Sequence, residues 1–450
     1  MKERLIVVGN GMAGVRVLEE LLARAPDRYD VTVLGSEPHP SYNRLMLSPV
    51  LAGEKRFEDI VTHDRDWYAA KGIALHTGTT VSRFDPRARR VDTADGRSFS
   101  YDKLLLATGS HPVIIPVPGK DLPGVITFRD IADVDAMLEA CGAGRRAVVI
   151  GGGLLGLEAA DGLLARGMTV TVVHLMPTVM ERQLDASAGV LLKRELEERG
   201  LRILTAADTQ AIVGDGKVEA VRLRDGRAIP ADIVVMAVGI RPNADLARGA
   251  GLAVERGVVV DDRMVTSDPH VLAVGECVQH RGQTYGLVAP LYEMAEVAAD
   301  TLAGRADSLY APSVTSTKLK VTGIDLFSAG DFLGGADCDD IVFRDPARGV
   351  YKRIVLKENR VAGAVLYGDT ADGAWLFRLM RERSDISEWR ETLIFGPFFQ
   401  DGSPGPAPVA AALMSSPEPG SSEDACSAGS PSAVAQVRLE GARAAPVAHA

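Results

Sequence analysis

The sequence LIVVGNGMAG at residues 5–14 decides the fold, and AVVIGGGLLG at residues 147–156 repeats its pattern. In each stretch an apolar run of strand character leads into a GxGxxG motif, which opens a segment of helical periodicity. The first glycine permits a tight turn, the second lets backbone N–H groups approach a pyrophosphate, and the third lets the helix pack closely on the strand. The motifs therefore predict two dinucleotide sites, built on Gly9, Gly11 and Gly14 and on Gly151, Gly153 and Gly156.

The residues that follow each motif bear on how a nucleotide is held. Glu37 stands 23 positions after Gly14, near the roughly 20-residue offset at which a carboxylate reaches ribose hydroxyls. In the second unit the corresponding residue is His174, 18 positions after Gly156. We interpret His174 either as a ribose contact or as a cap of a strand end at the surface. The choice between NADH and NADPH stays open. Sites that prefer NADP usually bring an arginine near this position, and none follows His174 before Pro177, which favours NAD.

The strand pattern predicts that one nucleotide unit is inserted in the other. An apolar run ending in Gly109 is repeated by a run ending in Gly239, and residues 257–275 return to strand character. We expect an α/β protein with two nested Rossmann-like dinucleotide-binding domains and a C-terminal α+β interface domain. The predicted parts are an FAD-binding domain at residues 1–110 and 240–305, an NAD(P)-binding domain at 111–239, the interface domain at 306–398 and a tail at 399–450.

Shorter patterns predict the remaining elements. Residues 73–75, 80–84, 90–92 and 99–101 predict a small antiparallel piece around an Asp-Gly turn. In the C-terminal part we predict strands at 318–322, 341–343, 351–356 and 361–367 and a helix at 374–383. The tail is rich in Ala, Pro, Ser and Gly, so it is predicted to be disordered.

Composition excludes several classes of function. The formal net charge of -10 argues against a nucleic-acid partner and favours partners with a basic face. The four cysteines are far apart in sequence, which excludes a CxxC pair and suits a reducing cytoplasm. No metal site is proposed, because the eight histidines show no ligand spacing. No apolar run reaches the roughly 18 residues of a membrane span, and the first strand leaves no room for a cleavable signal.

Longer motifs show a family resemblance. The stretches GNGMAG, GGGLLGLE, YNRLMLSPVLAG (residues 42–53), LLLATG, VVHLMPTVMERQLD (172–185) and VLAVGECVQH (271–280) resemble the FAD- and NAD-binding part of assimilatory NAD(P)H nitrite reductase large subunits. More broadly they are similar to the pyridine nucleotide-disulfide oxidoreductase superfamily. The resemblance covers residues 1–396 and stops before the iron-sulfur and siroheme modules of those large subunits.

The resemblance implies a set of cofactor-binding residues. FAD would be held by Gly9, Gly11, Gly14, Glu37, Arg44, Thr108, Gly109, Glu276 and Pro290, and the nicotinamide nucleotide by Gly151, Gly153, Gly156 and Glu158. Glu276 stands where the superfamily usually has Asp, and the helix start at Ala289 to Leu291 would face the flavin ring. Arg44 is a candidate partner of the pyrophosphate, although an arginine in such a Pro-rich loop is more often solvated. Pro49 takes the place of a lysine that many relatives pair with Glu158.

The chemistry that follows needs no catalytic side chain. A hydride would pass from the nicotinamide to the flavin, and the protein would position and tune the two rings. The electrons would go to a separate redox protein: an iron-sulfur or siroheme protein, or a nitrate reductase subunit. Two alternatives stay open: a rubredoxin or ferredoxin reductase of another pathway, and a redox-sensing flavoprotein without rapid turnover.

Three further expectations concern a cysteine, two lysines and the C-terminal domain. Cys277, beside Glu276, is interpreted as a buried core residue rather than a reactive thiol. Lys318 and Lys320 are candidates for contact with an acceptor, but a charged pair on one strand face is more often solvated. The interface domain would cover the flavin, and a homodimer is consistent with it.

Overall fold

The computed structural model describes residues 2–305, 307–312, 316–318 and 323–397. The first glycine motif lies between β1 (Glu3–Val8) and α1 (Met12–Arg24). β1 is the central strand of a five-stranded parallel sheet in the order β21-β9-β1-β2-β5. The other strands of this sheet are β2 (Tyr29–Leu34), β5 (Ala74–His76), β9 (Lys103–Leu106) and β21 (Val271–Ala273). Because β21 comes late in the chain, the first unit is completed only after the second.

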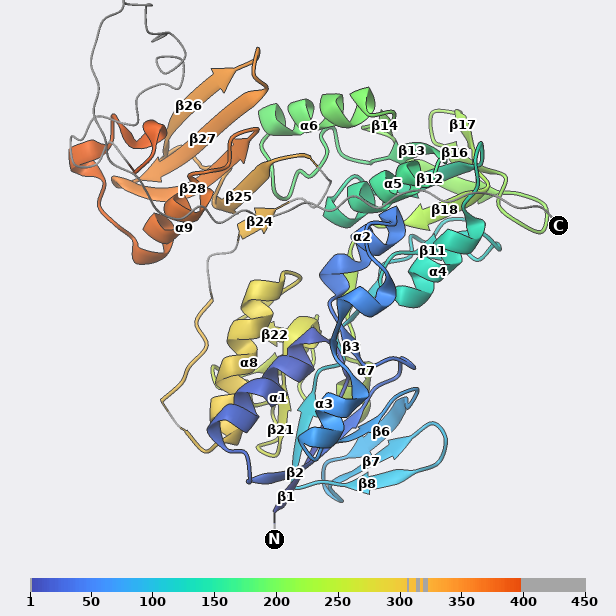
Figure 1. Ribbon diagram of the computed structural model, residues 1–450, viewed down its shortest axis with the longest axis vertical. Helices are drawn as coiled ribbons and strands as arrows, with labels where there is room; N and C mark the ends of the chain where they lie inside the picture. The colour runs from blue at the N-terminus through green and yellow to red at the C-terminus, as the bar shows by residue number, and fades with distance from the viewer. Residues whose placement is uncertain (1, 306, 313–315, 319–322, 398–450) are drawn as a thin grey trace, which may run out of the picture. The chain divides into compact units, whose positions relative to one another are not determined.

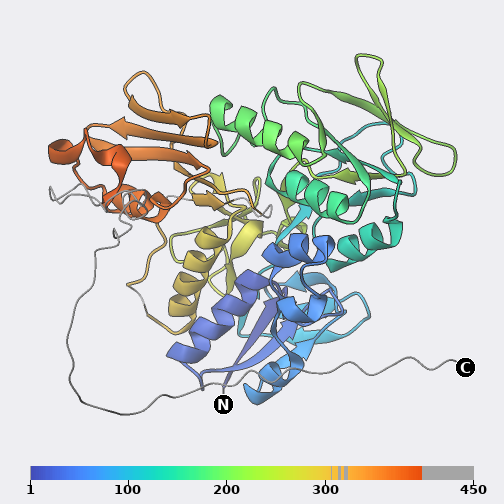
Figure 2. The same ribbon diagram turned by 45° about the horizontal axis from the view of Figure 1, so that its top comes forward.

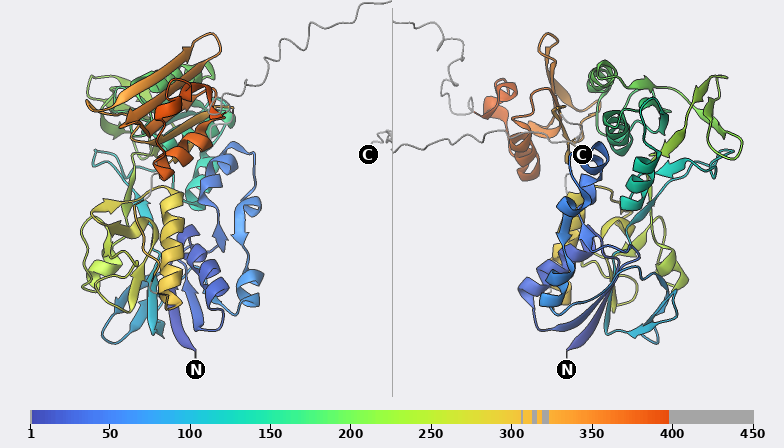
Figure 3. Two further views of the ribbon diagram at one scale, coloured as in Figure 1. Left: turned by 90° about the vertical axis from the view of Figure 1, so that its left-hand side faces the viewer. Right: turned by 45° about the vertical axis from the view of Figure 1, so that its right-hand side comes forward.

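The helix that closes the first unit also comes late. α8 (Val288–Leu302) packs side by side with α1 (Figures 1 and 3). The hydroxyl of Tyr29 on β2 donates to the carbonyl oxygen of Leu302 at 2.9 Å. The buried core joins residues of β1, α1 and α8. The first and last parts of the nested arrangement thus share one core, as the sequence predicted.

One predicted strand belongs to a different sheet. Residues 73–75 were expected in the antiparallel piece, but β5 is a parallel neighbour of β2, with Thr32 opposite Ala74. The reason is the short helix α3 (Arg65–Ala70), capped by Asp64, which turns the chain back into a parallel crossover. The antiparallel piece is β6 (Val81–Asp85), β7 (Arg90–Thr93) and β8 (Ser98–Ser100).

The second glycine motif starts a second parallel sheet, in the order β11-β18-β12-β13-β14. Its strands are β11 (Val125–Thr127), β12 (Arg146–Ile150), β13 (Thr169–Val173), β14 (Arg202–Leu204) and β18 (Ile233–Met236). Its helices are α4 (Ile131–Ala140), α5 (Leu154–Ala165) and α6 (Ala186–Glu198). An antiparallel extension consists of β15 (Thr209–Val213), β16 (Ala220–Leu223) and β17 (Ala228–Pro230).

The chain crosses between the two units twice, and the crossings pair with each other. β10 (Ser110–Pro112) and β19 (Ile240–Pro242) form a two-stranded antiparallel sheet. The domain boundaries at 110/111 and 239/240 fall on these strands and stay a prediction. Beyond the second crossing lie α7 (Asp245–Gly249), β20 (Val258–Val260), β22 (Val278–His280) and β23 (Gln283–Thr284).

The C-terminal part is an antiparallel sheet with one long helix (Figure 2). The strand order is β24-β25-β28-β27-β26, and α9 packs on β25 and β28. Their bounds are β24 (Ser316–Lys318), β25 (Leu326–Gly330), β26 (Asp339–Asp345), β27 (Val350–Lys357), β28 (Arg360–Tyr367) and α9 (Gly373–Glu382). β25 was not predicted. Residues 319–322, the side chains of Lys318 and Lys320, and the predicted tail lie outside the described part of the chain.

The segment after Arg44 is helical. β3 (Ser41–Tyr42), which pairs with β4 (Val61–His63), leads into α2 (Leu47–Ala52). Arg166, at the end of α5, donates to the carbonyl oxygens of Leu51 and Val50, at 2.6 and 3.1 Å. Both carbonyls lie in the last turn of α2, where the helix leaves carbonyl oxygens open to outside donors. The Val50 oxygen also accepts from the backbone N–H of Gly53 at 3.1 Å. Arg166 therefore fixes α2 of the first unit on α5 of the second.

No helix in the described ranges is long and apolar enough to cross a membrane.

We predict that Arg166→Ala lowers the free energy of unfolding by about 1.5–3 kcal/mol, because two charge-assisted hydrogen bonds to α2 are lost. Equilibrium urea unfolding followed by tryptophan fluorescence measures the change. The matched control is Arg194→Ala, which removes a largely exposed ion pair with Glu198 on α6 and should change stability by no more than about 0.5 kcal/mol. Equal unfolding midpoints for the two variants would contradict the role given to Arg166.

Candidate functional site

The first glycine motif forms a turn that only glycine can make. Gly9 has a φ of +108°, and a Cβ there would lie 2.1 Å from the carbonyl oxygen of Ala107. A Cβ at Gly14 would lie 2.9 Å from the carbonyl oxygen of Gly9, so α1 rests directly on the turn. Gly11 is the N-cap of α1 and has nothing within 4 Å of its Cβ position. The motif therefore leaves room at a helix N-terminus, where backbone N–H groups bind phosphate.

The second motif repeats this geometry. Gly151 has a φ of +120°, and its Cβ would lie 2.3 Å from the carbonyl oxygen of Ala237. A Cβ at Gly156 would lie 2.0 Å from the carbonyl oxygen of Gly151. Gly153 is the N-cap of α5, again with open space at its Cβ position. Both motifs thus have the backbone that a pyrophosphate requires.

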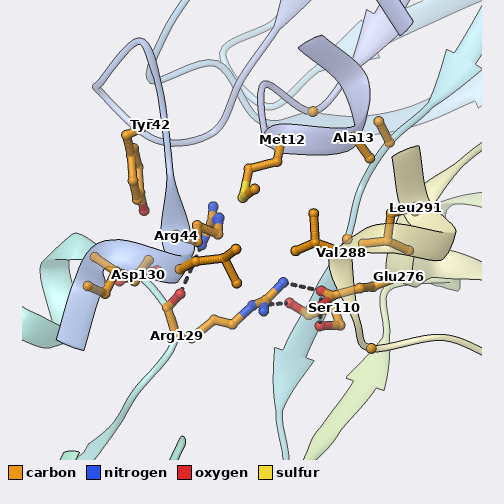
Figure 4. Close-up of a pocket in the computed structure, with 18 of the residues that line it drawn as sticks. Met12, Ala13, Tyr42, Arg44, Ser110, Arg129, Asp130, Glu276, Val288 and Leu291 are labelled. Atoms are coloured by element: carbon orange, nitrogen blue, oxygen red, sulfur yellow. Dashed lines mark hydrogen bonds and ion pairs between the residues drawn. The ribbon is translucent and has the colours of Figure 1, made fainter. Parts of the chain in front are cut away.

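A cavity of about 700 Å³ lies against the first motif (Figure 4). The predicted residues that line it are Gly9, Gly11, Glu37, Arg44, Thr108, Gly109, Glu158 and Glu276. Gly14 is buried beneath the turn. Pro290 is buried in α8, and its neighbours Ala289 and Leu291 line the cavity instead. Gly151, Gly153 and Gly156 are not among the lining residues of this cavity.

Glu37 and Arg44 meet in one corner of the cavity. Glu37 accepts a hydrogen bond from the hydroxyl of Tyr42 at 2.6 Å and is paired with Arg44. Arg44 also donates to the carbonyl oxygen of Arg129 at 3.0 Å. Burial raises the pKa of Tyr42, so its phenol stays protonated and donates. Arg44 is therefore not a solvated loop arginine; it is ordered beside the carboxylate predicted to hold ribose.

A second charged pair, Arg129 with Glu276, lies at the cavity beside the first (Figure 4). Glu276 accepts from the hydroxyl of Ser110 at 2.8 Å and is paired with Arg129. Arg129 donates from Nε to the carbonyl oxygen of Ser110 at 3.1 Å. Sequence reasoning missed Arg129 and Ser110, because neither lies in a recognisable motif. Only the fold brings Arg129 to a glutamate 147 positions away.

Asn10, inside the first motif, carries a polar group suited to a ligand. Its Oδ1 accepts from the hydroxyl of Tyr68 at 2.7 Å. Its buried Nδ2 has no hydrogen-bond partner in the described part of the chain, and Asn10 lines the cavity. A buried donor without a partner is costly unless a ligand or water accepts from it. With the open N-cap at Gly11 and the size of the cavity, this residue set fits a bound FAD.

Glu158 joins the second unit to this cavity. It lies in the second turn of α5, and the hydroxyl of Ser48 on α2 donates to its Oε2 at 2.6 Å. Both side chains are buried. The family resemblance implied a lysine at the position of Pro49 as a partner of Glu158. The neighbouring Ser48 supplies a neutral hydroxyl to this carboxylate.

Thr108 ties the end of β9 to the second crossing strand. Its hydroxyl donates to the carbonyl oxygen of Asn243 at 2.8 Å, and the Asn243 amide donates back to the Thr108 carbonyl oxygen at 2.9 Å. Ser316 and Thr317 of β24 also line the cavity. The C-terminal sheet therefore contributes to the cavity wall.

His174 is buried, so its interpretation as a surface cap is wrong. Its Nδ1 accepts from the backbone N–H of Gly152 at 3.0 Å. The returning segment at residues 178–181, which the sequence pattern did not indicate, encloses the ring.

Cys277 is a core residue, as predicted. It is fully buried, and its thiol lies 3.2 Å from the carbonyl oxygen of Val274. Burial raises the pKa of this thiol, which suppresses the reactive thiolate.

Comparison with known proteins agrees with this geometry. The family model described as pyridine nucleotide-disulphide oxidoreductase matches residues 3–300, and the one described as rubredoxin NAD+ reductase C-terminal domain matches residues 316–384. Nitrite reductase [NAD(P)H] of Bacillus subtilis (strain 168) is 51% identical over 400 residues, which cover 89% of this chain and 50% of that protein. The assimilatory nitrate reductase electron transfer subunit of the same organism is 44% identical over 403 residues, which cover 89% of this chain and 52% of that protein.

The chain thus spans about half the length of these curated relatives. A solved structure, the covalent putidaredoxin reductase-putidaredoxin complex, matches with a TM-score of 0.78 and 28% identity. That match covers 85% of this chain and 94% of the other. The chain therefore belongs to the pyridine nucleotide-disulphide oxidoreductase family, whose members are oxidoreductases that bind FAD and NAD(P)H.

Proposed function

We propose that this chain takes electrons from NAD(P)H, through FAD held in the cavity, and passes them to a separate redox protein in nitrite or nitrate assimilation. One observation carries the proposal. The cavity that contains the first glycine motif also reaches Leu154, Leu155 and Glu158 on α5, the helix that the second motif opens. A ligand of the first motif and a ligand of the second would therefore meet at the start of α5.

The proposed roles of the residues follow from their positions. The N–H groups at the open N-caps Gly11 and Gly153 would each hold a pyrophosphate. Glu37 would accept from ribose hydroxyls, and Glu276 would hold the ribityl chain. Bound FAD would supply the ability to take two electrons together and release them singly. The apolar residues Met12, Val288 and Leu291 would exclude water from the meeting point (Figure 4).

The nature of the acceptor is also a proposal. The two Bacillus subtilis relatives are named for nitrite reduction and for electron transfer in nitrate assimilation. An iron-sulfur or siroheme protein, or a nitrate reductase subunit, is therefore the acceptor that we propose. The net charge of -10 favours an acceptor with a basic docking face.

A second candidate function is the reduction of a ferredoxin or rubredoxin in another pathway. It is favoured by the match of residues 316–384 to a rubredoxin reductase domain and by the nearly full-length match to the putidaredoxin reductase complex.

Anaerobic mixing of the reduced protein with purified acceptors separates the two functions. We expect the redox partner of nitrite or nitrate reduction to reoxidise the flavin at least tenfold faster than ferredoxin or rubredoxin does. The reverse order would favour the second candidate. Slow reoxidation by every acceptor would contradict both.

We predict that Gly11→Val yields a folded but colourless protein. The backbone at Gly11 is extended, with φ -85° and ψ -179°, and its Cβ position is open, so valine fits the unliganded chain but fills the space of the pyrophosphate. The absorbance of bound flavin after purification measures the loss. Gly249→Val, at another open position on α7, is the control and should stay yellow. A fully flavinated Gly11→Val variant would refute this placement of FAD.

We predict that Gly153→Val keeps its flavin but is no longer bleached by NAD(P)H. Gly153 has the same extended backbone as Gly11, with φ -83° and ψ -175°, but lies at the second motif. Anaerobic stopped-flow absorbance measures the bleaching. A variant that is bleached at the wild-type rate would contradict a nicotinamide site at this motif.

A further inference from the structure

Both ring nitrogens of His174 make contacts within the protein. Its side chain is 9% exposed. Because Nδ1 accepts from Gly152, the proton must be on Nε2 in the neutral ring. Nε2 lies 3.0 Å from Oε2 of Glu181 and 3.1 Å from the carbonyl oxygen of Thr178. Both ring nitrogens are therefore engaged, and neither can serve a ribose without breaking these bonds.

Glu181 is the carboxylate that this ring places beside the second glycine loop. The backbone N–H of Met180 donates to the carbonyl oxygen of Gly152 at 2.9 Å, so the segment folds back onto the loop. The side chain of Glu181 is 29% exposed. No partner is found for its Oε1 within the described ranges of the chain. One oxygen is thus oriented by His174 while the other is available to a ligand.

The surroundings of Glu181 suit the adenosine end of a nucleotide without a 2′-phosphate. Leu175 and Met176, directly after His174, are 63% and 42% exposed and offer an apolar surface to a flat base. No charged residue lies between His174 and Glu181 in the sequence. A 2′-phosphate would bring about -1.5 to -2 charges toward a carboxylate. The first cation along the chain is Arg182, which is exposed.

We propose that Glu181, oriented by His174, accepts hydrogen bonds from the adenosine ribose hydroxyls and selects NADH over NADPH. This inference rests on the proposed function and adds to it the choice of reductant. In dinucleotide sites a carboxylate usually stands at the end of the second strand, where this chain has His174. Here the carboxylate is that of Glu181, seven positions later, and His174 orients it. His174 is a positioning residue, and Glu181 is the specificity-determining one.

Two measurements on the FAD-loaded protein test the proposal: affinities of NAD+ and NADP+ by calorimetry, and flavin bleaching by NADH and NADPH in anaerobic stopped flow. The unmodified protein should prefer the NAD form in both. Glu181→Gln should weaken NAD+ binding and NADH reduction roughly tenfold, with little loss for the NADP form. Glu198→Gln, at the exposed end of α6, and Arg182→Gln should leave the preference unchanged.

The role of His174 is tested by a double-mutant cycle. His174→Leu should lower the NADH preference, and His174→Leu with Glu181→Gln should lower it no further, because both act on one interaction. A purely structural role would instead weaken both nucleotides equally. If His174→Leu does not fold, the nucleotide affinities and bleaching rates of Glu181→Gln test the proposal by themselves.

The proposal is overturned if the unmodified protein prefers NADP+ or if Glu181→Gln leaves the preference unchanged. Failure of both nucleotides to bleach the flavin would instead refute the proposed function. The affinities of NAD+ and NADP+ would then still decide the choice of nucleotide.

Discussion

The structure depends on a contact that occurs in both units: a helix packs directly on the glycine turn that precedes it. At Gly14 and at Gly156 a single added carbon would collide with the turn, at 2.9 and 2.0 Å from its carbonyl oxygen. The contact places the starts of α1 and α5 where neither helix has a side-chain cap and the space beside its N-cap glycine is open. The first N–H groups of a helix have no partner within the helix. These N–H groups and the helix dipole together favour an anion. Fold and nucleotide binding therefore rest on the same backbone contact.

Three carboxylates around the cavity have partners within the chain. Glu37 is matched by Arg44, Glu276 by Arg129, and Glu158 by the hydroxyl of Ser48. A buried carboxylate without such a partner would be costly. Arg44 lies only 7 positions from Glu37, but Arg129 lies 147 positions from Glu276, and Ser48 lies 110 positions from Glu158. These last two contacts join the first unit to the second at the cavity. Arg166 reinforces this, because it joins α2, which carries Ser48, to α5, which carries Glu158.

The sequence was most informative where the constraint is local. The glycine spacing predicted both turns, and the apolar runs predicted β1, β12 and β13 closely, because turn and strand are set by neighbouring residues. β5 was placed in the wrong sheet, since three residues carry too little pattern to show which strand they pair with. In the C-terminal sheet β26, β27 and β28 were predicted and β25 was not. The strand predicted at 318–322 lies almost wholly outside the described residues.

The site was predictable only in part for the same reason. Glu37 follows from its spacing to the first motif and Thr108 from the family resemblance, whereas Arg129 depends on a contact across the fold. Asn10 stands at a position of the first motif where the pattern accepts any residue, so the spacing gave no signal for its unpaired amide. His174 was noticed, but its burial depends on the return of residues 178–181. Contacts that form only in the folded chain, which single-sequence patterns do not contain, decided each of these.

The central claim is that electrons pass between two bound nucleotides with no redox-active side chain between them. The most direct test is an anaerobic titration of the FAD-loaded protein with NADH or NADPH, whichever reduces it, in which oxidised flavin and consumed nucleotide are followed together. The flavin should be fully reduced after one equivalent per FAD, with no further consumption. Consumption of a second equivalent would reveal another electron store, such as a thiol pair, and would contradict the claim.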